Sequence, residues 1–143
     1  MGLSTRAADY GTVPILRHIE ESNREILLLV LIEDLEALDQ IDAIAATEGI
    51  DVICVGPSDL GRALGVVGQP NHPELVAAID RIAEAAKKHG KFLSLSLGHK
   101  LFPRTVAELR ELGVQYVNCG PEPQVHLLRT WSEQVQGIRS QFK

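Results

Sequence analysis

Residues 26–34 read Ile-Leu-Leu-Leu-Val-Leu-Ile-Glu-Asp. The apolar part of this stretch does not alternate with polar residues, which is typical of a strand covered on both faces, as the strands of parallel sheets are. We therefore predict a buried parallel strand over residues 26–32. Two carboxylates, Glu33 and Asp34, follow directly at its carboxyl end.

Short β-rich runs alternate with longer helical stretches along the rest of the chain. Between the runs, apolar residues recur at spacings of three and four, which predicts helices. The helical stretches are long enough for parallel crossovers, and no hairpin signal joins the runs. The predicted order is αβαβαβαβα, with strands at 26–32, 51–55, 92–97 and 114–119 and helices at 13–23, 35–45, 73–90, 103–112 and 124–142.

This alternation predicts an α/β architecture in a single domain over residues 1–143, because no linker or low-complexity tract interrupts it. Four parallel strands fit two architectures. One is a small open doubly wound sheet, as in a flavodoxin-like nucleotide binder. The other is a half barrel, four of the eight βα units of a TIM (βα)8 barrel, whose usual length is ~250 residues.

Composition narrows the class of protein. The chain is 45% hydrophobic and 23% charged, which is the globular pattern. Its net charge of -5, from 14 basic and 19 acidic residues, argues against a broad basic face for nucleic acid. No apolar stretch approaches the ~20 residues of a membrane span, and the start lacks a secretory apolar core, so we expect a cytoplasmic protein. Cys54 and Cys119 lie in apolar runs, which predicts buried, reduced thiols.

Carboxylates follow two of the predicted strands. Glu33 comes after the first strand and Asp59 after the second, so parallel pairing brings both to the same edge of the sheet. Adjacent carboxylates repel each other unless a cation or a shared proton intervenes, and Mg²⁺ or Mn²⁺ is held by one or two carboxylates plus waters and substrate oxygens. The alternative is that both are solvated loop charges. For Asp34, directly before a helix, we predict an N-cap.

Other candidate groups carry weaker signals. Residues 55–61 read Val-Gly-Pro-Ser-Asp-Leu-Gly, which predicts a tight polar turn, but neither nucleotide-binding glycine motif is present. His99 follows the third strand and is either a base at the sheet edge or a solvated loop histidine. The remaining histidines fall on predicted helices or helix ends: His18, His72, His89 and His126. No pair of them has the sequence spacing of metal ligands.

A longer set of residues resembles a known family. It comprises Ile32-Glu33, the string Glu-Gly-Ile-Asp-Val-Ile-Cys-Val-Gly-Pro-Ser-Asp-Leu at 48–60, Ala-Leu-Gly at 63–65, His-Pro-Glu at 72–74 and Gly90-Lys91. These residues look like the HpcH/HpaI aldolase family, the metal-dependent class II pyruvate aldolases related to the citrate lyase β-subunit. The resemblance runs over nearly the whole chain, including Gly-Leu-Ser-Thr-Arg-Ala at 2–7.

The resemblance implies a site and a reaction. Glu33 and Asp59 would be the two ligands of a divalent metal ion, Mg²⁺ or Mn²⁺. Gly56, Pro57, Ser58 and Asp59 would bind pyruvate, with backbone amides of this segment receiving its carboxylate. The metal would act as a Lewis acid that stabilises the enolate, and reaction with an aldehyde would form or break a carbon-carbon bond.

The family is a complete barrel, and this chain resembles only its second half. The family's acid/base His and its substrate-holding Arg lie in the first half, so the catalytic residues are unknown here and we expect weak enolisation at most. Met1 is expected to stand where the family has an internal Val, through a start at an internal GTG codon or a truncated gene. The alternative to an aldolase is a catalytically incomplete half-barrel that binds metal or oxo acid, or serves as an oligomerising partner.

We also expect a homo-oligomer. Unpaired edges of an open sheet favour association between chains. The family commonly forms hexamers that exchange the C-terminal helix, which here would be the helix predicted at 124–142.

Overall fold

A computed structural model describes residues 4–119 and 123–142. Met1 and the Gly2-Leu3 part of the resemblance lie outside these residues. The elements, in chain order, are a 3-10 helix η1 (Arg6–Gly11), α1 (Ile15–Glu25), β1 (Leu29–Ile32), α2 (Leu35–Asp39), α3 (Ile41–Ala46), β2 (Val52–Val55), α4 (Pro57–Ala63), α5 (Pro73–Lys88), β3 (Phe92–Leu97), α6 (Val106–Glu111), β4 (Val114–Cys119) and α7 (Pro123–Ser140).

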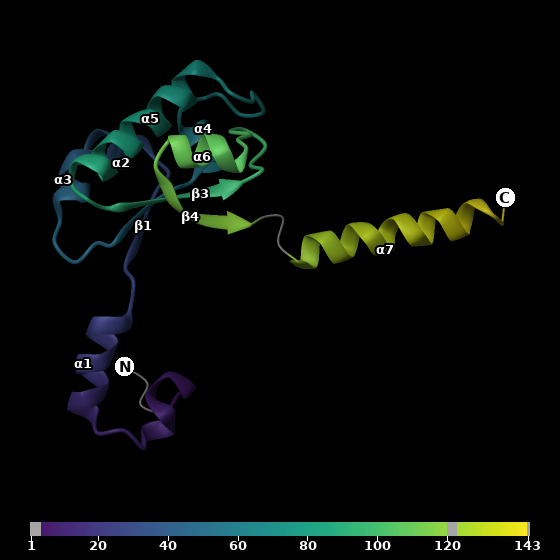
Figure 1. Cartoon of the computed structure of the whole chain (residues 1–143). Helices are drawn as coiled ribbons and strands as arrows, with labels where there is room; N and C mark the ends of the chain where they lie inside the picture. Colours follow the sequence, from purple (N-terminus) through teal and green to yellow (C-terminus); the bar gives the residue numbers. More distant parts are fainter. Residues whose placement is uncertain (1–3, 120–122, 143) are drawn as a thin grey trace.

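The four strands form one parallel sheet in the order β1-β2-β3-β4 (Figure 1). This confirms the predicted parallel α/β fold and all four predicted strands, although β1 begins at Leu29 rather than at Ile26. A doubly wound sheet reverses its strand order at a switch point. Here each strand pairs with the next one along the chain, as in a (βα)8 barrel, so the flavodoxin-like alternative is wrong.

The hydrophobic core lies between the sheet and the helices on one of its faces. Because side chains alternate along a strand, every second residue points into this core. The middle of the core is α5, whose apolar residues at spacings of three and four pack against β2 and β3. The largest core side chains that are at most 2% exposed are Ile32, Ile41, Ile53, Leu60, Leu75, Ile79, Ile82, Leu93, Leu95, Phe102 and Leu109.

The other face of the sheet is partly open. By the strand register, Leu29 and Leu31 of β1 lie on the same face as Phe92 of β3 and Tyr116 of β4. These four side chains are 39%, 52%, 53% and 44% exposed. The expectation that the first strand is covered on both faces is therefore wrong for this structure, because the α/β body has helices on one face only (Figure 1).

Local signals explain where several helices begin and end. α5 starts at Pro73, whose ring suits the first helical turn, and ends before Gly90, as predicted. The helix predicted at 103–112 starts later, because Thr105 forms a capping box with Glu108. The helix predicted at 35–45 is divided at Gln40, which gives α2 and α3.

Both cysteines are free thiols. Their predicted burial is wrong: Cys119 is exposed and Cys54 is only partly buried. Cys54 lies on the open face of the sheet, beside Leu31 of β1. Cys119 ends β4, one of the two edge strands.

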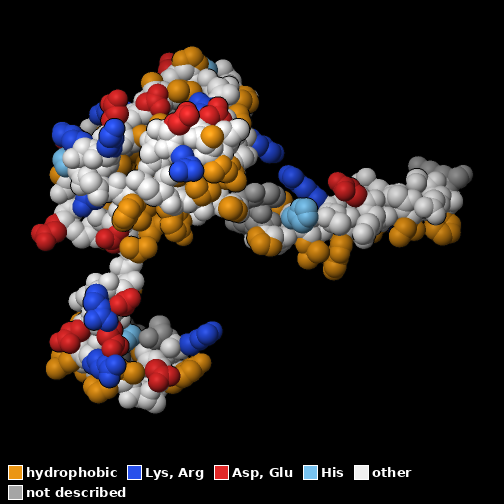
Figure 2. Space-filling view, in the orientation of Figure 1, with side chains coloured by type: hydrophobic (Ala, Val, Ile, Leu, Met, Phe, Trp, Pro, Cys, Tyr) orange, Lys and Arg blue, Asp and Glu red, His pale blue; other side chains and the backbone are white. Residues whose placement is uncertain are grey.

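Two helices project from the α/β body (Figure 1). α1 and α7 correspond to the helices predicted at 13–23 and 124–142, and neither contains a buried residue. Figure 2 shows hydrophobic side chains along one side of α7. Over the described residues, no helix is both long and apolar enough to span a membrane.

Candidate active site

The candidate site lies at the carboxyl edge of the sheet. Glu33 directly follows β1, Gly56 connects β2 to α4, and Gly98 and His99 directly follow β3. Because the strands are parallel, these segments meet at one edge, where ligands gather in α/β folds. Gly98 has a φ of +69°, a left-handed conformation that glycine adopts without strain, and it turns the chain after β3.

The segment after β2 is a helix and not the predicted polar turn. α4 begins at Pro57, and its first turn contains Ser58 and Asp59. The buried side chain of Leu60 faces the core and stabilises the helix, a tertiary contact that the polar residues around it conceal in the sequence. Pro, Ser and Asp, which are also common in turns, thus form the first turn of a helix at the sheet edge.

The two neighbouring carboxylates after β1 have different roles. Asp34 is an N-cap, as predicted: its Oδ1 accepts a hydrogen bond of 2.7 Å from the backbone N–H of Ala37. Glu33 is half-buried, and its carboxylate makes no hydrogen bond or ion pair with any described residue. Of the pair, Glu33 is therefore the carboxylate that remains available to a ligand.

Gly56 brings the start of α4 against Glu33. Its N–H donates to the carbonyl of Ile32 over 3.0 Å. A Cβ at Gly56 would lie 3.0 Å from the Glu33 Cβ and 3.3 Å from its Oε2. The absence of a side chain at position 56 therefore leaves the space that the Glu33 carboxylate occupies.

Asp59 lies in the first turn of α4 with 52% of its side chain exposed. Its carboxylate forms a weak ion pair with Arg62, in which Oδ1 lies 3.4 Å from both Nε and Nη2. Exposed pairs of this kind contribute little free energy, so Asp59 can exchange Arg62 for a cation at small cost. Within residues 4–119 and 123–142, no three His, Cys, Asp or Glu side chains form a metal-binding group.

His99 reaches back from β3 to α4. Its Nε2 lies 3.0 Å from Ser58 Oγ, and its Nδ1 accepts a hydrogen bond of 3.2 Å from the backbone N–H of Leu101. Burial lowers the pKa of His99 below its usual value, which favours the neutral ring at pH 7. His99 is thus partly buried and hydrogen-bonded, unlike a solvated loop histidine. Sequence reasoning missed its contact with Ser58, because 41 positions separate the two residues.

A pocket of about 780 Å³ adjoins this pair. Ser58 and His99 line it together with residues of the loop after β3 and one side chain from α7, Arg129. The size is within the range of small-molecule sites.

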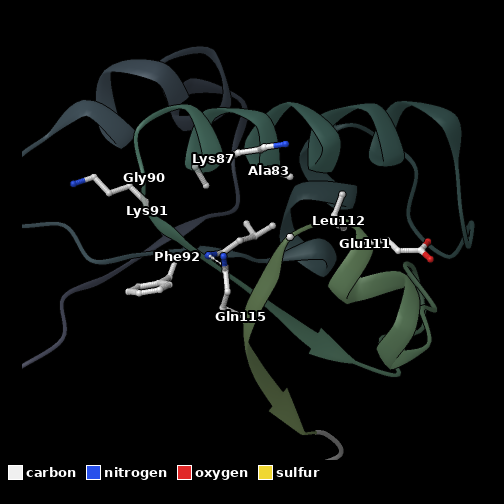
Figure 3. A pocket seen from close by; sticks show the side chains of 11 residues that line it. Ala83, Lys87, Gly90, Lys91, Phe92, Glu111, Leu112 and Gln115 are labelled. Carbon is white, nitrogen blue, oxygen red and sulfur yellow. Dashed lines mark hydrogen bonds between the residues drawn. The ribbon is translucent and has the colours of Figure 1, made fainter.

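A second pocket, of about 320 Å³, lies at the opposite end of the strands (Figure 3). Two of its polar side chains have structural partners: Lys91 Nζ donates to the carbonyls of Thr47 and Ile50, and Gln115 Oε1 accepts from the N–H of Leu93. Because this pocket lies at the strand starts, away from Glu33 and Asp59, we assign the 780 Å³ pocket to the candidate site.

Comparison with known proteins decides the family. The model of the HpcH/HpaI aldolase/citrate lyase family matches residues 5–120. This chain belongs to that family. The HpcH/HpaI chain is 50% identical over 91 residues to a protein of Enterobacter sp. (strain 638) named 5-keto-4-deoxy-D-glucarate aldolase, covering 64% of this chain and 35% of that protein. A Klebsiella pneumoniae protein of the same name is 48% identical over the same coverage. The chain thus spans about a third of the length of these curated relatives.

Solved structures agree with this assignment. An HpcH/HpaI aldolase/citrate lyase family protein from Burkholderia cenocepacia superimposes with a TM-score of 0.75 at 27% identity, over 97% of this chain and 52% of that one. The citrate synthase SbnG superimposes with a TM-score of 0.72 at 29% identity, over 90% of this chain and 51% of that one. The HpcH/HpaI chain therefore has the fold of about half of each of these proteins.

The contact between Gly56 and Glu33 gives a first prediction. If Glu33 holds a divalent cation, as proposed below, Gly56→Ala is expected to weaken Mn²⁺ binding about 10-fold or more, because the new Cβ displaces the Glu33 carboxylate. The φ of Gly56 is -102°, so alanine adds no backbone strain. Isothermal titration with Mn²⁺ measures the effect. Gly137→Ala is the matched control, since no atom lies within 4 Å of its added Cβ, and equal affinity in the two variants would contradict the prediction.

Proposed function

We propose that this chain carries the metal- and oxo-acid-binding edge of a class II aldolase, a lyase that forms or breaks a carbon-carbon bond next to a 2-oxo acid such as pyruvate. The observation that carries the proposal is the Glu33 carboxylate, half-buried against Gly56 and without a partner among the described residues. A half-buried carboxylate without a counter-charge costs free energy, which a bound cation offsets. The relatives named 5-keto-4-deoxy-D-glucarate aldolase support the reaction class.

Each residue at this edge of the sheet would have a separate role. Glu33 and Asp59 would hold a divalent cation, Mg²⁺ or Mn²⁺, and the open coordination positions would be left to water and substrate oxygens. When bound, such a cation supplies Lewis-acid stabilisation of the negative charge that develops on the oxo acid. The Gly56 N–H already donates a hydrogen bond to the Ile32 carbonyl. The backbone N–H groups of Ser58 and Asp59 would therefore be the ones that bind the carboxylate of pyruvate. An aldehyde would be the second substrate.

A thermal melt of the 143-residue chain, alone and with Mn²⁺ plus pyruvate, tests this proposal. A ligand at 100 times its Kd stabilises the native state by ~2.7 kcal/mol, which is about 10 °C in Tm for a domain of this size. We expect a cooperative transition that moves upward with both ligands and less with either alone. A transition that does not move would contradict the proposal.

A second candidate function is a catalytically incomplete half-barrel that binds metal or oxo acid, or serves as an oligomerising partner. It is favoured by the open face of the sheet, where Leu31 and Phe92 are more than half exposed. Measurable turnover of an oxo-acid aldol by the purified chain would favour the aldolase. Ligand binding without turnover would favour the incomplete half-barrel.

We also propose that the chain forms a homo-oligomer through α7. Five of its exposed hydrophobic side chains, together with Phe142 just after the helix, recur at spacings of three and four and form one stripe, which suits packing against another helix or sheet. Sedimentation velocity of the wild-type chain and of Trp131→Glu tests this proposal, because a charge in the stripe is expected to lower the mass of the assembly. The stripe comprises Val125, Leu128, Trp131, Val135, Ile138 and Phe142.

A further inference from the structure

The pair formed by Ser58 and His99 has a defined hydrogen-bond polarity. The Leu101 N–H donates to His99 Nδ1, so in the neutral ring the proton lies on Nε2. That Nε2–H then donates to Ser58 Oγ over 3.0 Å. With one lone pair occupied by the histidine, the serine keeps its own O–H proton as a donor for a third group.

The loop that carries His99 is held from several sides. The Leu101 carbonyl accepts a hydrogen bond of 2.8 Å from the N–H of Asn71. Phe102 is 2% exposed, and the guanidinium of Arg104 stacks on its ring at 3.9 Å from the centroid. His99 is therefore positioned by a packed loop, which a residue that orients another group requires.

The 780 Å³ pocket beside the pair has a positive lining. Its charged lining residues are Lys100 and Arg129, and no Asp or Glu is among its lining residues. The chain as a whole carries a net charge of -5, so the charge of this lining is opposite in sign to the net charge of the chain. A positive pocket with a hydroxyl donor suits a small anion.

The geometry points to His99 as a positioning residue: its Nε2–H holds Ser58 so that the serine hydroxyl donates to a carboxylate-bearing small molecule in the 780 Å³ pocket. This inference rests on the proposed function in one respect, that the anion would be the second component of the aldol reaction. The pair itself is formed without a metal and without Glu33.

The test uses the full 143-residue chain labelled with ¹⁵N, in metal-free buffer with EDTA. 4-Oxobutanoate and butanal are the probes, because both are four-carbon aldehydes, only 4-oxobutanoate carries a carboxylate, and neither is a 2-oxo acid. Histidine ring ¹⁵N spectra report which nitrogen carries the proton, and amide spectra follow binding at Ser58 and Gly98. The variants are His99→Phe, which removes the donor; His99→Gln, whose side-chain amide restores an N–H; and Ser58→Ala.

We expect the His99 proton on Nε2, and 4-oxobutanoate to bind at Ser58 and His99 at least ~10-fold more tightly than butanal. His99→Phe and Ser58→Ala should each weaken binding of 4-oxobutanoate about 10-fold, and His99→Gln should restore binding to within about threefold of wild type. A proton on Nδ1, unchanged affinity in His99→Phe, or no response to 4-oxobutanoate at Ser58 and His99 would each overturn the inference. Because the experiment contains no metal, its outcome does not depend on whether Glu33 and Asp59 bind a cation.

Discussion

Replacing Glu33 by Gln and Asp59 by Asn together is expected to abolish the thermal stabilisation by Mn²⁺ plus pyruvate and to weaken Mn²⁺ binding by at least ~100-fold. Loss of a single outer partner of a metal site typically costs 10–100-fold in affinity, and here both proposed ligands are removed. Both substitutions keep the size and shape of the side chain, so the fold should persist. Differential scanning fluorimetry and titration with Mn²⁺ measure the two effects.

The matched control for this variant is Glu48→Gln with Asp80→Asn. It makes the same change in net charge at two exposed carboxylates that have no recorded partner among the described residues. The control should retain the wild-type Mn²⁺ affinity. If both double variants bind Mn²⁺ like the wild-type chain, the metal lies elsewhere and the proposed site is wrong.

Ile79→Ala is expected to lower the free energy of unfolding by about 3 kcal/mol, because the substitution leaves a cavity between α5 and the sheet. Ile79 is 0% exposed and belongs to the core that holds the helices on the sheet. Such a loss is a large part of the 5–15 kcal/mol that stabilises a typical domain. Urea unfolding followed by circular dichroism measures it.

Val106→Ala is the control for Ile79→Ala, since Val106 starts α6 with 55% of its surface exposed. Its effect should stay within about 0.5 kcal/mol. A loss below 1 kcal/mol for Ile79→Ala would mean that the helices are loosely packed on the sheet, contrary to the close contacts described above.

The sequence was sufficient to predict which side chains lie at the carboxyl edge of the sheet, because their positions depend on the order of the strands. Glu33 and Asp59 follow strands that are consecutive in the chain, and parallel pairing brings their carboxyl ends to one edge. The capping role of Asp34 was predictable for a similar reason, because a cap is a contact between near neighbours in sequence. Whether Glu33 and Asp59 bind a metal stays a prediction.

Two errors have the same origin. The segment 55–61 was predicted to be a turn because it contains Gly, Pro, Ser and Asp, but burial of Leu60 makes it helical. The strand 26–32 was predicted to be covered on both faces because it is wholly apolar, yet Leu31 is 52% exposed. In both cases the composition is compatible with two environments, and long-range packing selects one of them.

The sequence by itself determined the order and type of the main elements, the parallel sheet, the family and the edge at which chemistry is expected, because periodicity, caps and motifs are local or follow strand order. The tertiary structure alone decided that His99 meets Ser58, that Gly56 packs against Glu33, and which face of the sheet is open. These are contacts between distant residues, and their formation depends on how the loops fold back over the sheet. No local pattern in the chain encodes that path.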